Sequence, residues 1–379
     1  MEENTMNRRA ILGGMAAAGT AGAFGALAVR DAAAAQTTAA APDMGTAQAP
    51  TITDVKGKVV YITGGSSGIG LGIAQVMHEA GANVVIGNLD DKQFADALKK
   101  FPDNDPRIHT VVHNVMDKDG WQRTADEIEK KYGPVAILVN NAGVGLQQPA
   151  STGTLKDWEW GMGVNLWGPI YGVNTYVQRM LAGKSGAHIV TTTSTSGLLP
   201  GSGAGIYTVS KIAAIGLMEE LRQELRETNI GTSAFVPGFT TTNIGQSESH
   251  RPEDLKNTAP AAVTLPRAGG GAGGPPRGGP GGQRPAAAAP PSPYWTRPQD
   301  PVVVGRVVLD GILHNDLFII LQPEYRMGME ARMNAFLESM TPVQPMPANI
   351  AAGNYYRTPI YVQEIAHRKA TQKRTIAGI

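Results

Sequence analysis

Seven short runs of apolar residues recur along the chain after Lys56, separated by longer stretches of mixed polarity. The runs occupy residues 59–62, 84–86, 108–112, 135–139, 187–193, 232–236 and 317–321. Each run is nearly continuous in apolar residues, which is typical of strands that are buried on both faces of a sheet. The pattern therefore predicts seven buried strands.

The stretches between these runs are long enough to hold helices. Residues 70–79 and 117–132 show amphipathic patterns, and the second of them is rich in charged side chains. Strands that alternate with helix-length segments are joined by right-handed crossovers, which produce a parallel sheet. The sequence therefore predicts an α/β fold with a doubly wound parallel sheet (a Rossmann fold), in which ligands bind at the carboxyl ends of the strands.

Residues 246–299 break this pattern. Glycine and proline dominate the part between Pro266 and Pro298, which also contains four arginines. Such a composition cannot bury enough apolar area to offset the entropy lost on ordering. We expect a single domain over residues 55–341 that carries 246–299 as a Gly/Pro-rich insertion or lid. A C-terminal extension, 342–379, then wraps a neighbouring subunit or stays partly disordered.

Residues 1–36 have the order of a secretory signal peptide. Arg8 and Arg9 precede an apolar, Gly/Ala-rich run over 11–29 and a stretch of small residues. The paired arginines resemble the twin-arginine type, which predicts export of the folded protein to the periplasm and cleavage. A membrane-tethered or cytoplasmic protein is the alternative, although so many Gly and Ala residues make a weak membrane-spanning helix. Residues 37–54 are rich in Ala, Pro and Thr and are expected to form a flexible linker.

Composition narrows the classes of function. The net charge of +1 argues against a nucleic-acid binder, which would show a basic excess. The absence of cysteine excludes disulfides, thiolate zinc sites and cysteine nucleophiles. His109 and His113 lie along one predicted strand, roughly 13 Å apart at the usual rise, which is too far to share a metal ion. No metal site is therefore expected.

Glycines follow the first predicted strand, in the sequence Thr-Gly-Gly-Ser-Ser-Gly-Ile-Gly over residues 63–70. They permit a tight turn and a close approach of the backbone to a pyrophosphate, which the N–H groups of the next helix then face. A simple strand–helix connection would show similar glycines. Their position after the first core strand favours a dinucleotide site.

Six short sequence elements occur in a fixed order along the chain, and the order matters as much as the elements themselves. They are Gly-x-x-x-Gly-x-Gly at Gly64, Gly68 and Gly70, Asn-Asn-Ala-Gly at 140–143, Asn165, Ser194 thirteen residues before Tyr207, Tyr-x-x-x-Lys at Tyr207 and Lys211, and Pro237-Gly238 followed by Thr242. This set resembles the short-chain dehydrogenase/reductase family over residues 56–242, and residues 317–340 resemble the family's last strand and a following helix. A Tyr and a Lys four residues apart mean nothing alone, but six ordered matches by accident are very improbable.

The resemblance implies hydride transfer between a nicotinamide and a secondary alcohol or ketone. Tyr207 then exchanges a proton with the substrate oxygen, to which Ser194 hydrogen-bonds. Lys211 holds the ribose hydroxyls, and Asn165 orders a water that links Lys211 to solvent. The residue types suit this chemistry, because a phenol has a pKa of about 10, and a lysine one helical turn away favours the phenolate. Ser196 is a rival for the serine role, but its spacing to Tyr207 matches less well.

The resemblance also implies the residues that contact the cofactor. They are Gly64, Ser66, Ser67, Gly68, Ile69, Gly70, Asn88, Asn114, Val115, Asn141, Ala142, Gly143, Tyr207, Lys211, Pro237, Gly238 and Thr242. At the end of the second strand an acid favours NAD and a nearby base favours NADP. Here Asn88 holds that position, Asp90 is close, and no Lys or Arg precedes Lys92, so NAD is favoured while NADP stays possible. Asn88 and Asn114, the latter in place of the family's usual aspartate, depart from the family pattern.

The leading interpretation is an exported NAD(P)-dependent alcohol dehydrogenase or carbonyl reductase. Because the periplasm is not expected to offer a soluble nicotinamide pool, such an enzyme would hold its NAD tightly and recycle it with a second substrate or a redox partner. The alternatives are a cytoplasmic NADPH-dependent ketoreductase and a non-catalytic dinucleotide-binding sensor or scaffold. By resemblance, a homodimer or homotetramer is expected, formed through the helix of Asn165 and the helix of Tyr207 and Lys211.

Overall fold

The computed structural model describes residues 44–201, 203–258, 298–341 and 358–371. The predicted signal peptide, most of the predicted insertion and most of the C-terminal extension therefore lie outside the described residues. In the described part of the chain, no helix is long and apolar enough to cross a membrane. The same part contains no group of three or more His, Cys, Asp or Glu side chains that could hold a metal ion.

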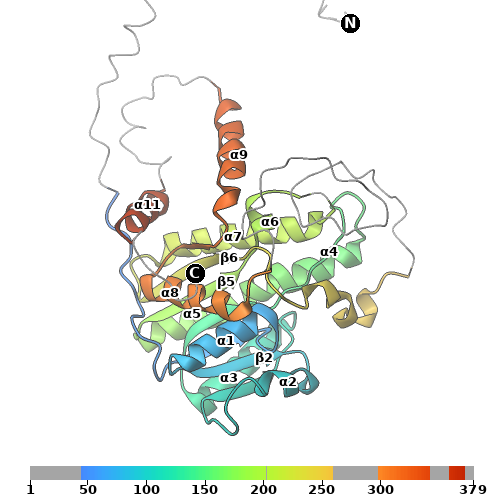
Figure 1. Ribbon diagram of the computed structural model, residues 1–379, viewed down its shortest axis with the longest axis vertical. Coiled ribbons are helices and arrows are strands. Elements are labelled where there is room, and N and C mark those ends of the chain that lie inside the picture. Colours follow the sequence, from blue (N-terminus) through green and yellow to red (C-terminus); the bar gives the residue numbers. More distant parts are fainter. Residues whose placement is uncertain (1–43, 202, 259–297, 342–357, 372–379) are drawn as a thin grey trace, which may run out of the picture. The chain divides into compact units, whose positions relative to one another are not determined.

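Seven parallel strands form one sheet in the described ranges (Figure 1). They are β1 (Val59–Thr63), β2 (Asn83–Asn88), β3 (Ile108–Val112), β4 (Val135–Asn140), β5 (Ala187–Thr192), β6 (Ile230–Val236) and β7 (Phe318–Ile320). Their spatial order is β3-β2-β1-β4-β5-β6-β7. The seven strands expected from the apolar runs are all present, and the fold is the predicted doubly wound α/β sheet.

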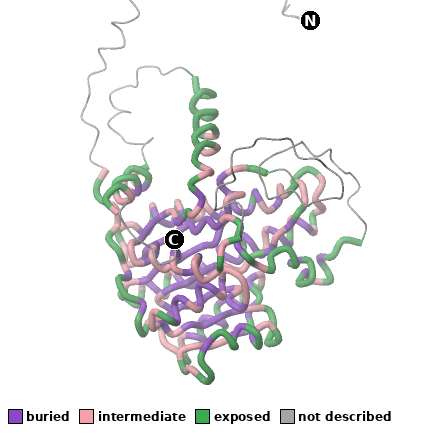
Figure 2. Tube along the Cα trace, viewed as in Figure 1, coloured by how far each residue is buried: buried purple, intermediate pink, exposed green. Residues whose placement is uncertain are grey.

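The described residues also form α-helices, and several of them cover the two faces of this sheet (Figure 1). The helices are α1 (Gly68–Glu79), α2 (Ala95–Leu98), α3 (Lys118–Tyr132), α4 (Leu155–Met162), α5 (Gly168–Gly183), α6 (Thr195–Leu198), α7 (Gly205–Leu225), α8 (Pro301–His314), α9 (Arg326–Glu338) and α11 (Pro359–Thr371). On one face, Ile73 and Met77 of α1 pack with Val308 of α8. On the other, Trp121 of α3 packs with Tyr176 of α5. Both clusters include strand residues, so the strands are buried on two sides (Figure 2).

The strand order reverses between β1 and β4, which pair side by side. The chain leaving β1 enters α1 on one face of the sheet, whereas the chain leaving β4 reaches α5 on the other. A crevice forms at such a reversal because the two connections diverge. The candidate site is therefore expected at the carboxyl ends of β1 and β4.

Residues 45–54, which the sequence predicts as part of a flexible linker, pack on the domain instead. Gln48 Nε2 donates hydrogen bonds to the carbonyl oxygens of Leu225 and Thr228, both at 3.1 Å. Ile52 is buried, with 1% of its surface exposed. The prediction of flexibility is wrong for this stretch, because an Ala/Pro/Thr-rich composition does not reveal contacts with residues so distant in the sequence.

The described part of the C-terminal extension is helix α11, which packs on its own chain. Glu364 accepts a hydrogen bond from the backbone N–H of Leu317 at 3.2 Å. Asp316 pairs with His367 at 2.8 Å and also with Arg368. These contacts attach α11 to the residues just before β7, so the packed body continues past the boundary expected at residue 341.

Helices α1 and α8 cross closely because each carries a glycine at the contact. A Cβ at Gly72 would lie 2.0 Å from the carbonyl oxygen of Pro301, and a Cβ at Gly305 would lie 2.5 Å from that of Gly72. We expect Gly72→Ala to lower the free energy of unfolding by about 1–3 kcal/mol, because the added methyl forces the helices apart.

Gly216→Ala in α7 is the matched control, because a Cβ there has no neighbouring atom within 4 Å. It should leave the free energy of unfolding unchanged or raise it by about 0.5–1 kcal/mol, as expected for glycine in a helix interior. Urea unfolding of both variants measures the difference. A Gly72→Ala protein as stable as the wild type would contradict the close crossing.

Candidate active site

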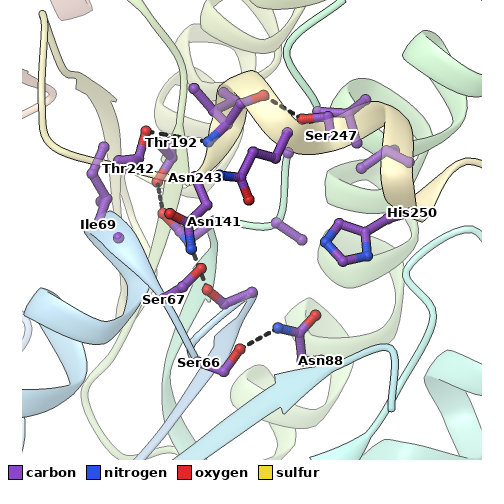
Figure 3. A pocket seen from close by; sticks show the side chains of 18 of the residues that line it. Ser66, Ser67, Ile69, Asn88, Asn141, Thr192, Thr242, Asn243, Ser247 and His250 are labelled. Carbon is purple, nitrogen blue, oxygen red and sulfur yellow. Dashed lines mark hydrogen bonds between the residues drawn. The ribbon is translucent and has the colours of Figure 1, made fainter. Parts of the chain in front are cut away.

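A cleft of about 890 Å³ opens at the carboxyl ends of the central strands. Most of the site residues expected from the sequence line it. They are Gly64, Ser66, Ser67, Gly68, Ile69, Asn88, Asn114, Val115, Asn141, Ala142, Gly143, Ser194, Tyr207, Lys211, Pro237, Gly238 and Thr242. Gly70 and Asn165 do not line it. Side chains from distant parts of the sequence thus face one cavity (Figure 3).

The turn after β1 requires glycine for two different reasons. Gly64 and Gly68 have φ angles of +63° and +52°, a backbone conformation that residues with a Cβ rarely adopt. A Cβ at Gly70 would lie 2.3 Å from the carbonyl oxygen of Gly64, so Gly70 permits the tight turn. Because α1 begins at Gly68, the unpaired N–H groups of its first turn face the cleft and suit an anionic ligand.

Asn141, which Figure 3 shows beside Thr192 at the cleft, joins the ends of three strands. Its Nδ2 donates to the carbonyl oxygen of Thr63, the last residue of β1, at 3.1 Å. Its Oδ1 accepts a hydrogen bond from Thr192 Oγ1, at the end of β5, at 3.2 Å. Because Asn141 directly follows β4, one amide side chain holds three neighbouring strand ends together. The sequence motif alone does not reveal this role.

Tyr207, Lys211 and Ser194 meet at one wall of the cleft. Tyr207 and Lys211 lie one turn apart on α7, and Ser194 lies between β5 and α6. Burial raises the pKa of Tyr207, and a hydrogen bond with Ser194 opposes that rise.

Lys211 is held inside the protein, with 3% of its surface exposed. Its Nζ donates to the carbonyl oxygen of Thr192 at 2.9 Å and lies 5.5 Å from the centre of the Tyr207 ring. Burial lowers the pKa of Lys211 to about 8. The ammonium group is therefore more acidic than that of an ordinary lysine. It also lies close enough to Tyr207 for its charge to favour the ionised phenol.

Asn165 lies next to this group on a π-helical turn, Gly163–Trp167, that continues α4. Its side chain pairs with the backbone of Val144, accepting from the N–H and donating to the carbonyl, both at 2.9 Å. A Cβ at Gly143 would lie 3.2 Å from Asn165 Oδ1 and 3.7 Å from Lys211 Nζ. Asn165 and Lys211 are thus close neighbours, and the role of Asn165 in ordering a water stays a prediction.

The two candidate serines occupy different positions. Ser194 lines the cleft, whereas Ser196 is not among the lining residues. Ser194 Oγ accepts a hydrogen bond from the backbone N–H of Ser196 at 3.1 Å, which begins the short helix α6. The geometry therefore favours Ser194 for a contact with a bound substrate.

The end of β2 forms another part of the cleft wall (Figure 3). Asn88 Nδ2 donates a hydrogen bond to Ser66 Oγ of the glycine turn. Asn114 and Asp96 also line the cleft. Lys99 Nζ lies 2.7 Å from Asp96 Oδ1 and is not itself a lining residue. The polar groups beside Asn88 are therefore neutral or acidic.

Pocket walls are expected from the region after Thr242, but the sequence does not identify the residues that line the cleft there. They are Asn243, Ile244, Gly245, Gln246, Ser247, His250 and Pro252. The polar run has no apolar periodicity, and its only signal is its position shortly after Pro237-Gly238. Trp160 of α4 also lines the cleft, with 1% of its surface exposed.

Comparisons with known proteins agree with this geometry. A sequence model of the short chain dehydrogenases matches residues 58–253. The C alpha-dehydrogenase of Sphingobium sp. (strain NBRC 103272 / SYK-6) is 32% identical over 295 residues, which are 78% of this chain and 90% of that protein. The NADP-dependent (R)-specific alcohol dehydrogenase of Lentilactobacillus kefiri is 34% identical over 193 residues, 50% of this chain and 76% of that protein.

A solved structure shows the same arrangement of the chain. The short chain dehydrogenase/reductase of Burkholderia phymatum, in complex with NAD, is similar with a TM-score of 0.64 and 26% sequence identity. The similarity covers 78% of this chain and 100% of that one.

Replacing Ser194 by Ala should raise the pKa of Tyr207 in the unliganded protein. The hydrogen bond with Ser194 lowers this pKa and burial raises it, so removing the bond leaves the burial effect unopposed. Ultraviolet absorbance titration, taken as the difference from Tyr207→Phe, isolates this phenol from the others. Ser196→Ala is the control and should leave the pKa of Tyr207 unchanged. A pKa that falls in Ser194→Ala would contradict the contact.

Proposed function

Because this chain belongs to the short-chain dehydrogenase family, we propose that its cleft interconverts a secondary alcohol and a ketone through Tyr207, Ser194, Lys211 and Asn165. The chain is an oxidoreductase that acts on CH–OH and C=O groups with NAD(P). The observation that supports the proposed proton relay is the position of Tyr207, which is partly buried at the cleft wall, hydrogen-bonded with Ser194, and has its ring centre 5.5 Å from Lys211 Nζ.

The residues of the cleft fit a dinucleotide. At Gly68 the cleft has no room for a side chain, because a Cβ there would lie 2.9 Å from Thr242 Cγ2, and the first turn of α1 offers unpaired N–H groups to a pyrophosphate. Ser66 and Asn88 offer neutral polar groups for a ribose. When bound, the nicotinamide supplies the hydride acceptor or donor.

The protein's own part in the reaction is to move and hold a proton. Tyr207 exchanges it with the substrate oxygen, and Ser194 hydrogen-bonds the same oxygen. Burial disfavours the phenolate, so the nearby charge of Lys211 is needed to stabilise it. With a pKa of about 8, Lys211 is mostly protonated at neutral pH and keeps that charge. Asn165, adjacent to Lys211, is the proposed link to solvent.

The described walls of the cleft favour a neutral, apolar substrate. Val144, Trp160 and Val164 line one part of it, and Phe239 and Ile244 add exposed apolar surface. Substrates of this kind gain from apolar burial, whereas a charged group would be desolvated without a partner there. We therefore propose an apolar secondary alcohol or ketone as the substrate class.

Tyr207→Phe should separate turnover from binding. Loss of the proton-transferring hydroxyl is expected to lower kcat by about 10²–10⁴-fold, while the dinucleotide still binds. Steady-state assays with apolar alcohols, and fluorescence titration with NADH, measure the two effects. Tyr132→Phe, which changes a tyrosine outside the cleft, is the control. A Tyr207→Phe protein with unchanged turnover would favour the non-catalytic sensor instead.

Preference for NAD over NADP is proposed from the residues around Asn88. No described Lys or Arg lines this part of the cleft, while Asp96 does, so a 2′-phosphate would meet no fixed cation. We expect kcat/KM to be higher with NAD, and Asn88→Asp to raise the NAD/NADP ratio by about tenfold through repulsion of the phosphate. Asn88→Gln is the neutral control. A wild-type ratio that favours NADPH would support the ketoreductase alternative.

A further inference from the structure

Residues 242–255, which we call the cleft cover, form one side of the cavity. The cover begins against the glycine turn, since a Cβ at Gly68 would lie 2.9 Å from Thr242 Cγ2. It extends to His250, whose Nδ1 lies 3.4 Å from Gln93 Nε2 in the chain that follows β2. Figure 3 shows His250 at the cavity. The cover thus spans the cleft from the glycine turn to the region after β2.

Three buried side chains hold this cover, at positions four residues apart. Ser247, Arg251 and Leu255 are 6%, 4% and 6% exposed, whereas the other residues of the cover are half-buried or exposed. Ser247 Oγ accepts a hydrogen bond from the backbone N–H of Gly145 at 2.9 Å. Leu255 packs in the apolar cluster that contains Trp160. The third anchor, Arg251, is a charge inside the protein.

Arg251 contacts the cover and α4 through different nitrogens of its guanidinium group. Its Nε donates to the carbonyl oxygen of Leu255 at 2.8 Å, and its Nη1 donates to Glu248 at 2.9 Å, so it bonds to both halves of the cover. Its Nη2 lies 2.7 Å from Asp157 Oδ1 on α4, and its central carbon lies 5.0 Å from the ring centre of Trp160. Asp157 and Trp160 are each 1% exposed, so the cover is joined to α4 out of contact with solvent.

Asp157 is itself fixed at the first turn of α4. Its carboxylate accepts hydrogen bonds from the backbone N–H of Thr154 at 2.8 Å and from Asn257 Nδ2 at 2.9 Å. Burial raises the pKa of Asp157, but the hydrogen bonds from Thr154, Arg251 and Asn257 outweigh it and hold the pKa below its usual value. Because α4 runs directly into the turn that carries Asn165, one continuous element connects the cover to the proposed relay.

We propose that Arg251 and Asp157 are positioning residues whose ion pair holds the cleft cover closed and sets how long a dinucleotide stays bound. This inference rests on the proposed function. A buried charge that loses its partner is strongly unfavourable, so removal of either member should let the cover open. Glu248, with 68% of its side chain exposed, should contribute much less than Asp157 to holding the cover closed.

Four variants separate the buried pair from its surroundings. Arg251→Met and Asp157→Asn each remove one charge of the pair. Asn257→Ala keeps both charges and removes one hydrogen bond to Asp157. Glu248→Gln is the matched control, because it removes a carboxylate that also contacts Arg251 but lies at the surface.

Two measurements are made on each full-length variant. Hydrogen–deuterium exchange of the unliganded protein reports opening of the backbone over 242–255. Stopped-flow release of NADH, or of NADPH if that binds more tightly, reports how long the dinucleotide stays bound. In Arg251→Met and Asp157→Asn we expect exchange over the cover to be faster by about tenfold, and release to be faster by about tenfold. Glu248→Gln should stay within about twofold of the wild type, and Asn257→Ala should fall between.

The outcomes distinguish this inference from the proposed function. Wild-type exchange and release in Asp157→Asn and Asn257→Ala overturn the inference, even if Arg251→Met fails to fold. Equal acceleration in Glu248→Gln also overturns it, because the surface contact would then matter as much as the buried one. A wild-type protein that binds neither NADH nor NADPH overturns the proposed function, while exchange in the unliganded protein still measures the hold of Arg251 on the cover.

Discussion

A lysine ammonium buried beside a phenol is the interaction around which this site is organised. Lys211 has no carboxylate partner among the described residues, and its Nζ is held by the carbonyl oxygen of Thr192. A buried cation without an anion is unfavourable, which is why its pKa falls to about 8. In the proposed relay, formation of the Tyr207 phenolate would provide the missing anion, and each of the two groups would favour the charged form of the other. The lysine that is costly to bury is therefore also the group that, in this proposed relay, favours the reactive form of the tyrosine.

The parallel sheet delivers these groups to one place because all of its strands end at the same edge. Lys211 reaches the end of β5 at Thr192, and Asn141 ties Thr192 to the end of β1 at Thr63. The hydrogen bonds that hold the lysine and those that hold the glycine turn thus share one residue, Thr192. A shift of one strand end would move both the residues of the proposed relay and the glycine turn. The reversal in strand order between β1 and β4 leaves this shared edge open to a ligand.

The sequence predicts the elements of this fold well where the signal is local. Continuous apolar runs identify the buried strands, and Ser194, Tyr207 and Lys211, expected from the family resemblance, all line the cleft. It fails where the structure depends on contacts between distant segments. Gln48 donates a hydrogen bond to a carbonyl oxygen at the end of α7, and Arg251 pairs with Asp157, which lies nearly a hundred residues earlier. The residues adjacent to Gln48 and Arg251 in the sequence do not predict either contact. Both lie in stretches whose Pro-rich or polar composition predicts a loop, because composition reports average solvation and not a single buried partner.

The two buried cations of the site differ in kind, and the difference follows from what each must do. A lysine changes its pKa readily on burial, which suits Lys211, since a group that takes part in proton transfer has to respond to the charge of its neighbours. An arginine keeps its charge, and its planar group can bond several partners at once. Burial lowers the pKa of Arg251, but its bonds to Glu248 and Asp157 outweigh burial and raise it. If the residue that anchors the cleft cover could lose its charge, proton transfer nearby would weaken the ion pair. Because arginine keeps its charge, the ion pair between Arg251 and Asp157 does not depend on the protonation state of the proposed relay.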